Sequence, residues 1–591
     1  MPEMSYTADA TTLGSLLSNA SSQIYVPEWQ RSYSWGSNQV EVFWLDLTRF
    51  MNAHPGDTIT GQSYFLGSVV IVNAGERGLL LDGQQRLATS TILLAALRET
   101  RRPLRADAST RLQSKYIADF DDATSSTRYS LTLNQYDEEF FRKGVQTEGS
   151  VFPDAKLRSH LLIRRAFEFF IESITAAVAT KTDQESLTWN LRLEKVLLNH
   201  MSVVEVRSDD EDEAASVFEA LNDRGIGLST PDLLRTLLIR KAPDAPSRGQ
   251  IVESWREVFS LLEEAGVDQF LRHYWVSLRG DVKTRSLYRE IKATESFEEN
   301  RAVEFSNKLA EAAVDYRALK DAIDSDDEVR RHLEAIRDLG ANVLFPALLS
   351  AIAVRETASG SLALFVRSLV ILFVRYTVIL GRESTKLEAT IYEVAKQLRS
   401  GGDYEAAVTS LRQFAPLLSD FRKGFSVAVV SRANSAKYIL GELEMSRRAT
   451  DELRLDNGKR VQLEHIYPQK PVGELRLPAH AALINRVGNL TLLDHRLNAE
   501  AKNSDFRAKR TTWYQQSQLL LTQELAGESA DVWGEAEIAR RQNEMAIEAA
   551  EVWAFDSLEL DSLLAQDAAG IEEAVLSENP DTLPEDEEVG A

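Results

Sequence analysis

The residues best suited to chemistry lie near the C-terminal end of the chain. Glu464 and His465 are adjacent, and Asn489 and Asn498 follow downstream. A carboxylate and an amide oxygen are hard ligands of the kind that Mg2+ prefers, and a histidine can take a proton from water at neutral pH. Because neighbouring residues on a strand point to opposite faces, Glu464 can hold a metal while His465 faces a phosphate. These residues predict a one-metal nuclease site.

The distribution of charge decides whether nucleic acid can bind there. The 591-residue chain has a formal net charge of −23, but 15 of its acidic side chains lie in residues 542–591, where no Lys or Arg occurs. Residues 459–510 carry ten Lys or Arg against five Asp or Glu. The overall acidity therefore does not exclude phosphate binding. We expect the acidic tail to be a solubilising end; the alternative is a cover that mimics nucleic acid over the basic segment.

Composition excludes several classes of protein. The chain has no cysteine, which rules out disulfides, thiol catalysis and cysteine-ligated zinc. The N-terminus lacks the basic-then-apolar pattern of a signal peptide. The most apolar run, residues 362–380, contains Arg367 and Arg375, so we expect a buried helix rather than a membrane span. The sequence predicts a cytoplasmic protein without a membrane partner.

A second candidate site begins with residues 26–35. Pro27 favours an extended or turning backbone. Gln30 and Arg31 could bind a phosphate or a base edge, and Tyr33 could stack on a base or a sugar. The alternative is that the aromatic residues of this motif pack in a core.

The next motif, Asp-Gly-Gln-Gln-Arg, lies where a strand is expected to end and a helix to begin. Residues 64–72 and 79–81 predict strands, and residues 85–100 read as a helix. Gly83 lets the backbone approach a ligand, helix-start amides attract anions, and Arg86 offers a planar fork for phosphate. A capped tight turn explains the first two residues of the motif but not the three that follow.

A third motif spans residues 217–234. A helix is expected to end at Asn222, two glycines turn the chain, and Pro231 begins another helix. Helix punctuation explains this pattern fully. The functional alternative is that Asn222 and Arg224 face the same ligand as Arg86, and nothing local decides between the two.

The order of these motifs resembles that of a known family. Residues 27–35, 82–87 and 218–225 look like the N-terminal domain of GmrSD-type restriction enzymes, which are type IV, modification-dependent enzymes. That domain is related to the ParB nucleotide-binding fold. Residues 464–469 and 488–493 look like the HNH-type nuclease domain of the same enzymes. The resemblance covers both ends of the chain.

The resemblance implies a multidomain α+β protein. We expect a ParB-like α/β domain at 1–240 that binds NTP and senses DNA, a helical connector at 241–445, and an HNH (ββα-metal) nuclease domain embedded in helices at 446–555. Residues 556–591 are expected to form an acidic, disordered tail. Apolar residues at helical spacing support the connector, among them Val252, Trp255, Val258, Phe259 and Leu262.

The resemblance also implies a function. It predicts an antiphage defence protein that senses DNA modification, hydrolyses GTP or ATP, and nicks or cleaves double-stranded DNA with Mg2+ or Mn2+. The family includes enzymes against glucosylated hydroxymethylcytosine DNA and SspE-like proteins that respond to phosphorothioate marks. A single HNH site cuts one strand, so a double-strand break would require a homodimer.

The motif positions of the family imply roles for individual residues. His465 matches the general base, and Glu464 matches the metal-binding acid, where aspartate is more usual. Asn489 matches a middle position that buttresses the loop. Asn498 matches the last metal ligand, with His495 as a competitor for that role. The residues expected to hold the phosphate backbone are Lys502 and Lys509. The N-terminal pocket is expected to contain Gln30, Arg31, Tyr33, Asp82, Gly83, Gln84, Gln85, Arg86, Asn222 and Arg224.

Two other functional classes remain open. One is an NTP-switched, DNA-binding regulatory protein whose nuclease domain is degenerate, which a metal-dependent plasmid nicking assay would separate from a nuclease. The other is an NTP hydrolase that acts mainly by depleting nucleotide, which product analysis with and without DNA would identify.

Overall fold

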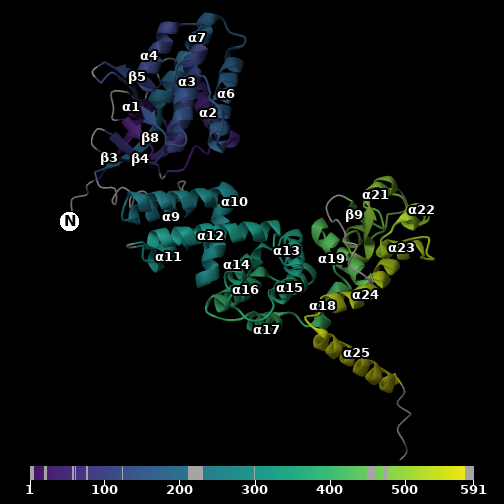
Figure 1. Ribbon diagram of the computed structural model, residues 1–591. Coiled ribbons are helices and arrows are strands. Elements are labelled where there is room, and N and C mark those ends of the chain that lie inside the picture. The colour runs from purple at the N-terminus through teal and green to yellow at the C-terminus, as the bar shows by residue number, and fades with distance from the viewer. Residues whose placement is uncertain are drawn as a thin grey trace, which may run out of the picture. The chain divides into compact units, whose positions relative to one another are not determined.

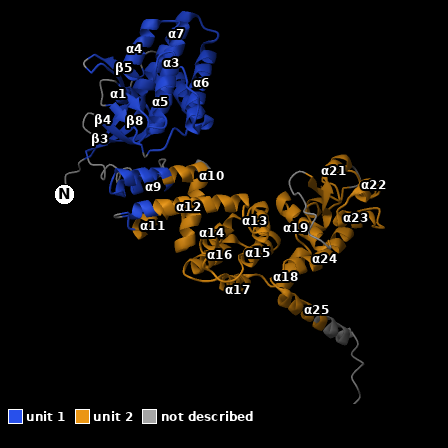
Figure 2. Ribbon diagram, viewed as in Figure 1, with its two compact units in different colours: residues 1–253, 296–304 blue, residues 254–295, 305–591 orange. Residues whose placement is uncertain are grey.

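The computed structural model describes residues 6–18, 23–28, 30–55, 59, 61–74, 77–122, 124–209, 230–297, 300–448, 460–471 and 476–578. The described chain mixes helices with small sheets, which confirms the predicted α+β class. It divides into two compact units (Figure 2). Unit 1 contains residues 1–253 and 296–304, and unit 2 contains residues 254–295 and 305–591.

Unit 1 is built on a six-stranded mixed sheet (Figure 1). Its strands are β1 (Tyr6–Thr12), β2 (Gln23–Tyr25), β3 (Tyr64–Ala74), β4 (Arg77–Asp82), β7 (Leu131–Thr132) and β8 (Met201–Ser208). The strand order is β1-β8-β3-β4-β2-β7. The pairs β1–β8 and β3–β4 are antiparallel, and the other three pairs are parallel. The strands predicted at 64–72 and 79–81 are confirmed as parts of β3 and β4.

Both faces of this sheet are covered, which explains the unbroken apolar run of β3. Val69 and Ile71 belong to the larger core of unit 1, whereas Val70 and Val72 belong to a smaller cluster. Helix α9 (Thr230–Lys241) packs Leu233 against that smaller cluster. Because successive strand residues point to opposite faces, a strand covered on both sides is apolar throughout.

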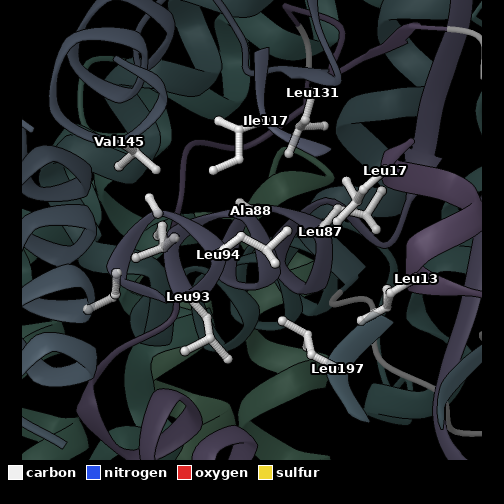
Figure 3. Packing of buried hydrophobic residues seen from close by; sticks show 14 of the residues in the cluster. Leu13, Leu17, Leu87, Ala88, Leu93, Leu94, Ile117, Leu131, Val145 and Leu197 are labelled. Carbon is white, nitrogen blue, oxygen red and sulfur yellow. The ribbon is translucent and has the colours of Figure 1, made fainter. Parts of the chain in front are cut away.

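The larger core surrounds helix α3 (Gln84–Arg101), which was predicted over residues 85–100 and is buried along nearly its whole length. Leu87, Leu93 and Leu94 of α3 lie among core residues from other elements, including Leu13 and Leu197 (Figure 3). The remaining elements of unit 1 up to β8 are α1 (Leu13–Leu17), α2 (Ser37–Ala53), α4 (Ala106–Tyr116), β5 (Ala118–Asp121), β6 (Ser126–Tyr129), α5 (Glu138–Phe141), η1 (Arg142–Gln146), α6 (Arg158–Val178) and α7 (Asp183–His200).

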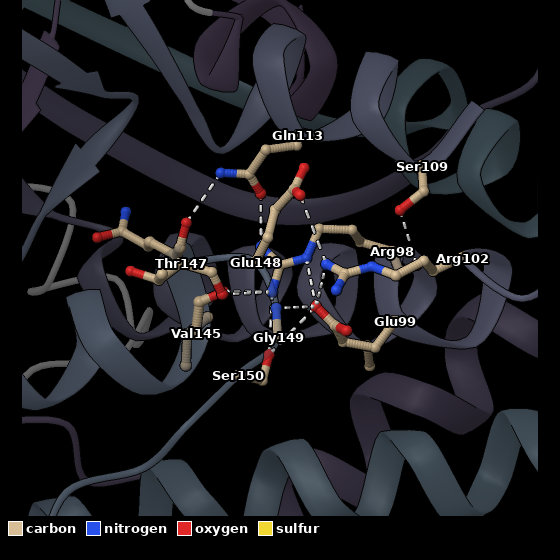
Figure 4. A network of polar contacts seen from close by, with 12 residues as sticks. Arg98, Glu99, Arg102, Ser109, Gln113, Val145, Thr147, Glu148, Gly149 and Ser150 are labelled. Carbon is tan, nitrogen blue, oxygen red and sulfur yellow. Dashed lines mark hydrogen bonds and ion pairs between the residues drawn. The ribbon is translucent and has the colours of Figure 1, made fainter. Parts of the chain in front are cut away.

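A buried arginine ties the end of α3 to the segment that follows η1. Arg98 has no exposed surface. Its Nη2 donates to the carbonyl oxygens of Val145 and Thr147, both at 3.0 Å, and to Ser150 Oγ at 2.9 Å. Its Nε donates to Glu99 Oε1 at 2.8 Å (Figure 4). This network satisfies the buried main-chain oxygen of Val145 and the part-buried one of Thr147.

Unit 2 begins with a helical array, as the apolar periodicity predicted. Its helices up to residue 446 are α10 (Ala245–Arg279), α11 (Leu287–Thr294), α12 (Arg301–Asp321), α13 (Asp327–Leu339), α14 (Phe345–Ala353), α15 (Leu362–Phe373), α16 (Ser384–Arg399), α17 (Tyr404–Phe414), α18 (Leu418–Phe425) and α19 (Ala433–Ser446). Two short 3-10 helices, η2 (Thr284–Ser286) and η3 (Asn342–Leu344), and the π-helix η4 (Val374–Ile379) complete this array. Helices α10 and α12 each cross the boundary between the units.

One helical stretch of the described chain, Leu362–Ile379, is long and apolar enough to span a membrane, and 67% of it is buried inside the protein. Arg375 within it is fully buried. Its guanidinium donates to the carbonyl oxygen of Trp553 at 2.7 Å and to Glu559 Oε1 at 2.8 Å. The predicted buried helix is confirmed, and these contacts explain how a charged residue is tolerated there.

The C-terminal part of unit 2 contains two antiparallel strands followed directly by a helix. These are β9 (Val461–His465), β10 (Leu490–Asp494) and α21 (His495–Ala501). They lie among α20 (His480–Leu483), η6 (Val487–Asn489), α22 (Phe506–Thr512), η7 (Tyr514–Gln516), α23 (Leu520–Ala526) and α24 (Glu535–Val552). A separate hydrophobic cluster that includes Ile466, Leu497 and Phe506 holds these elements together.

The tail predicted to be disordered from residue 556 is helical in its first part. Helix α25 spans Ser557–Glu578, while residues 579–591 lie outside the described residues. Glu559 pairs with Arg375, and Asp567 Oδ1 lies 2.6 Å from Arg422 Nη2. The acidic composition alone did not predict this helix, because the arginines that pair with Glu559 and Asp567 are far away in the sequence.

Candidate functional site

The strand pair β9–β10 and helix α21 bring three of the predicted nuclease residues onto consecutive elements. His465 is the last residue of β9 and pairs in register with Leu490, the first residue of β10. Asn489 directly precedes β10, and Asn498 lies on α21. The first turn of α21 is capped by Asp494, whose Oδ1 accepts the N–H of Arg496 at 2.9 Å.

Asn489 braces the loop that follows His465. Its side chain is fully buried. Its Oδ1 accepts the N–H of Tyr467 at 2.7 Å, and its Nδ2 donates to the carbonyl oxygens of Tyr467 at 3.1 Å and Ile484 at 3.0 Å. The main-chain oxygen of Asn489 also accepts the N–H of Ile466 at 2.9 Å. These contacts are of the buttressing kind that the family resemblance implied.

His465 is half-buried between two amide side chains. Its Nε2 lies 3.4 Å from Asn485 Oδ1 and 3.2 Å from Gln469 Nε2. Burial lowers the pKa of His465, and the nearby Lys509 ammonium acts in the same direction, while the Asn485 contact opposes it. The imidazole is therefore neutral at pH 7, which is the form that can accept a proton. The sequence analysis did not assign a role to Asn485 or Gln469.

Glu464 points away from His465 into a buried polar cluster. Its Oε1 lies 2.7 Å from Lys509 Nζ and accepts the Tyr514 hydroxyl at 3.1 Å. Lys509 and Tyr514 have no exposed surface, and Glu464 is only 4% exposed. Burial raises the pKa of Glu464 and lowers that of Lys509. Burial thus opposes both charges, so each depends on its partner.

The two predicted metal ligands make different contacts within the protein. The Glu464 carboxylate is engaged by the Lys509 ammonium, whereas Asn498 directs its Nδ2 to the carbonyl oxygen of Leu463 at 3.2 Å. Across the described ranges, no group of three or more His, Cys, Asp or Glu is placed to hold a metal. The Glu464 oxygen that pairs with Lys509 is therefore poorly suited to a divalent ion, and a metal site shared by Glu464 and Asn498 stays a prediction.

The two lysines expected to hold DNA phosphates differ completely in exposure. Lys502 is exposed, whereas Lys509 is fully buried, so the expectation that Lys509 contacts phosphate is wrong. Lys502 has φ 47° and ψ −130° in the turn after α21, where the Ser504 N–H reaches the Ala501 carbonyl at 3.1 Å. A positive φ is uncommon for a residue with a side chain, so the turn holds Lys502 in an unusual backbone conformation.

In unit 1, the first two N-terminal motifs lie together at the start of α3. Gln30 Nε2 donates to the Leu81 carbonyl at 2.9 Å, and Gln85 Oε1 accepts the N–H of Ser34 at 2.9 Å. The Tyr33 hydroxyl lies 2.9 Å from Thr89 Oγ1. These side chains hold residues 30–34 against α3, so part of the motif has a structural role.

Asp82 ends the central strand β4, and Arg86 lies on the first turn of α3, on the other side of Gly83. Ser68 Oγ donates to Asp82 Oδ2 at 3.1 Å, and Arg86 Nη1 donates to the carbonyl oxygen of Ser68. Burial raises the pKa of Asp82, which the Arg86 charge opposes. Gly83 has φ 98°, and a Cβ there would lie 2.8 Å from Val69 Cγ2. The glycine thus lets the chain pack closely against β3, while an approach to a ligand at this position stays a prediction.

The sequence analysis missed Asp137, which organises the same cluster. Asp137 Oδ2 accepts the Tyr33 N–H at 2.7 Å, and its Oδ1 accepts the Ser159 hydroxyl at 2.5 Å. Asn134 Nδ2 donates to the Gln30 carbonyl at 3.0 Å. No local pattern around Asp137 marks it, because its partners lie far away in the sequence.

The cavity beneath this cluster is small. Its volume is about 10 Å3, which is room for about one water molecule. Asn222 and Arg224 fall within 210–229, outside the described residues, so their expected place beside this cavity stays a prediction. The cavity is lined by Val26, Arg31, Tyr33, Gln84, Gln85, Ala88, Leu133, Asn134 and Asp137.

Comparison with known proteins agrees with this division of motifs. The model of the GmrSD restriction endonuclease N-terminal domain matches residues 13–239, and that of the C-terminal domain matches residues 416–547. No curated protein matches the chain. The first match contains α3 and every strand of the six-stranded sheet of unit 1 except β1, and the second contains β9, β10 and α21. The second also includes α19, whose Glu444 accepts the Leu521 N–H at 2.9 Å at the start of α23. The chain therefore belongs to the GmrSD family of restriction endonucleases, and its partner is DNA.

Proposed function

We propose that the C-terminal part of the chain is an HNH-type nuclease that nicks DNA with His465 as its general base. The observation that carries the proposal is the order of elements, in which His465 ends β9, Asn489 precedes β10 and Asn498 follows on α21. The lowered pKa of His465 supports it, because a general base must be unprotonated at the working pH.

In the proposed reaction, His465 accepts a proton from a water molecule as the water oxygen attacks the phosphorus. The bond from phosphorus to the leaving sugar oxygen breaks, and that oxygen takes a proton from solvent. A positioned base contributes about 10²–10⁴-fold to such a step. Lys502, exposed in the turn after α21, would hold the phosphate group as a point charge.

We propose Mg2+ or Mn2+ as the cofactor. The support is the resemblance of the motif together with general chemistry, since Mg2+ is commonly held by one or two protein oxygens, substrate phosphates and water. The arrangement of Glu464 does not support a role for this residue as the protein ligand. Chelation by EDTA is expected to stop nicking. Addition of Mg2+ or Mn2+, but not of Zn2+, should restore it.

We propose that unit 1 controls cutting by binding and hydrolysing GTP or ATP and by sensing DNA modification. The support is the convergence of Gln84, Arg31 and Asp137 around one cavity, with Asp82 and Arg86 beside it. Ligand sites for small molecules usually enclose about 300 Å3 or more. Nucleotide binding therefore requires residues 30–34 to shift or residues 210–229 to contribute.

The modification is either glucosylated hydroxymethylcytosine or a phosphorothioate. NTP hydrolysis and plasmid nicking, measured side by side on unmodified, glucosylated and phosphorothioated DNA, test the whole proposal. Nicking and NTP turnover that both change with one modification support it. NTP turnover without nicking on any substrate would instead favour an NTP-switched regulatory protein. Double-strand breaks would indicate that the nuclease acts as a homodimer.

A further inference from the structure

All three N–H donors of the Lys509 ammonium have acceptors inside the protein. Its Nζ lies 2.7 Å from Glu464 Oε1, 2.6 Å from the carbonyl oxygen of His465 and 3.4 Å from that of Ile466. An ammonium group has three donors, and these three acceptors account for them. A fully buried lysine with this set of contacts stabilises the two consecutive peptide groups that follow His465 and Ile466.

The Glu464 carboxylate joins this cluster from the face of β9 that does not carry His465. Neighbouring strand residues point to opposite faces, so Glu464 reaches the interior while His465 stays half-buried at the other face. Tyr514 donates to the same oxygen that faces Lys509. A divalent ion bound to this oxygen would stand close to the lysine ammonium, and repulsion between two such cations is strong in a buried environment.

The loop after His465 is therefore held from two sides. Lys509 holds the carbonyl oxygens of residues 465 and 466, and Asn489 holds the N–H groups of residues 466 and 467. We propose that Glu464 and Lys509 are positioning residues that fix the imidazole of His465, and that Glu464 is not a metal ligand. The inference rests on the proposed nuclease function.

The test uses the full-length chain with E464Q, K509M and the double variant. The control is E500Q, which makes the same change in an exposed pair on α21, where Arg496 Nη1 and Glu500 Oε1 lie 3.7 Å apart. The readouts are melting temperature, Mn2+ affinity from the electron paramagnetic resonance of the free ion, and kcat and KM for nicking below the melting range.

We expect both single variants to lower the melting temperature, and the double variant to lower it by less than their sum, because removing one partner leaves a buried charge unpaired. K509M should lower kcat by about 10–100-fold without changing KM for DNA, as expected when a reacting group is misplaced by about 1 Å. Mn2+ affinity should be the same in E464Q, the control and the wild type.

A metal-ligand role for Glu464 predicts the opposite pattern. Mn2+ affinity would then fall by about tenfold or more in E464Q. K509M would nick at least as fast as the wild type, because the Glu464 carboxylate would be free of its lysine partner. Either result would overturn the proposal. A decrease in melting temperature in the double variant that equals the sum of the two single decreases would also overturn it. If the wild type neither nicks DNA nor binds Mn2+, the proposed function fails, and the melting cycle still decides whether the two residues are coupled.

Discussion

The side-chain oxygen of Asn489 accepts the main-chain N–H of Tyr467 at 2.7 Å, and so joins the start of β10 to the loop that follows His465. The same side chain donates to two carbonyl oxygens and is fully buried. The catalytic histidine of the proposed site thus depends on a residue that need not touch DNA.

Asn489→Ala should destabilise unit 2 by about 2 kcal/mol, because it leaves buried main-chain groups without partners. Urea denaturation measures this loss, and nicking should fall in the folded protein as well. The matched control is Asn503→Ala, an exposed asparagine whose Oδ1 accepts the Lys470 N–H at 3.3 Å. Equal effects of the two substitutions would contradict the role of Asn489.

The pH dependence of nicking follows from burial of His465. Its pKa is lowered from the ordinary 6.5, and the protonated imidazole cannot accept a proton. The midpoint of the fall in rate at acidic pH should therefore lie below the ordinary pKa of about 6.5, because the rate is lost as the imidazole becomes protonated. Rates at saturating DNA across this range measure the profile, with DNA binding as the control. A midpoint above about pH 7 would mean that another group titrates.

Arg98→Ala should destabilise unit 1 by more than about 3 kcal/mol. The substitution deprives the Glu99 carboxylate of the buried Arg98 guanidinium, and it leaves the carbonyl oxygens of residues 145 and 147 without this donor. Faster proteolysis between residues 145 and 150 should accompany the loss. Arg102→Ala serves as the control, since that side chain is 37% exposed. Stability that is unchanged in the Arg98 variant would show that the network contributes little.

Arg86→Ala should abolish NTP turnover or its response to modified DNA if the start of α3 is the proposed ligand site. Arg86 also donates to the Ser68 carbonyl, so a thermal melt must accompany the assay. Arg77→Ala, an exposed arginine on β4 of the same sheet, is the control. Unchanged turnover and unchanged sensing in a folded Arg86 variant would reduce the motif to a structural turn.

Local patterns predicted the elements of the fold. The strand predicted from the β-branched run at 64–72 is part of β3, and the helix predicted at 85–100 is part of α3. The apolar spacing between 245 and 445 became a helical array. The alternation of strand side chains also placed Glu464 and His465 on opposite faces. Each of these features depends on residues that are close together in the sequence.

Long-range pairs could not be predicted in this way. The buried partner of Glu464 is Lys509, which the sequence suggested as a phosphate contact, and the organiser of residues 30–34 is Asp137, which no motif marked. Helix α25 is held by Arg375 and Arg422 from other helices. In each case the sequence shows a charged residue without showing which distant charge or hydrogen-bond partner meets it.

The most direct test of the central claim is nicking of supercoiled plasmid DNA by His465→Ala beside the wild type, with Mg2+ or Mn2+ present. The variant should lose nicking by at least about 100-fold, while it still binds DNA and hydrolyses NTP at the wild-type rate. Nicking by the purified variant at the wild-type rate would contradict the assignment of His465 as the general base.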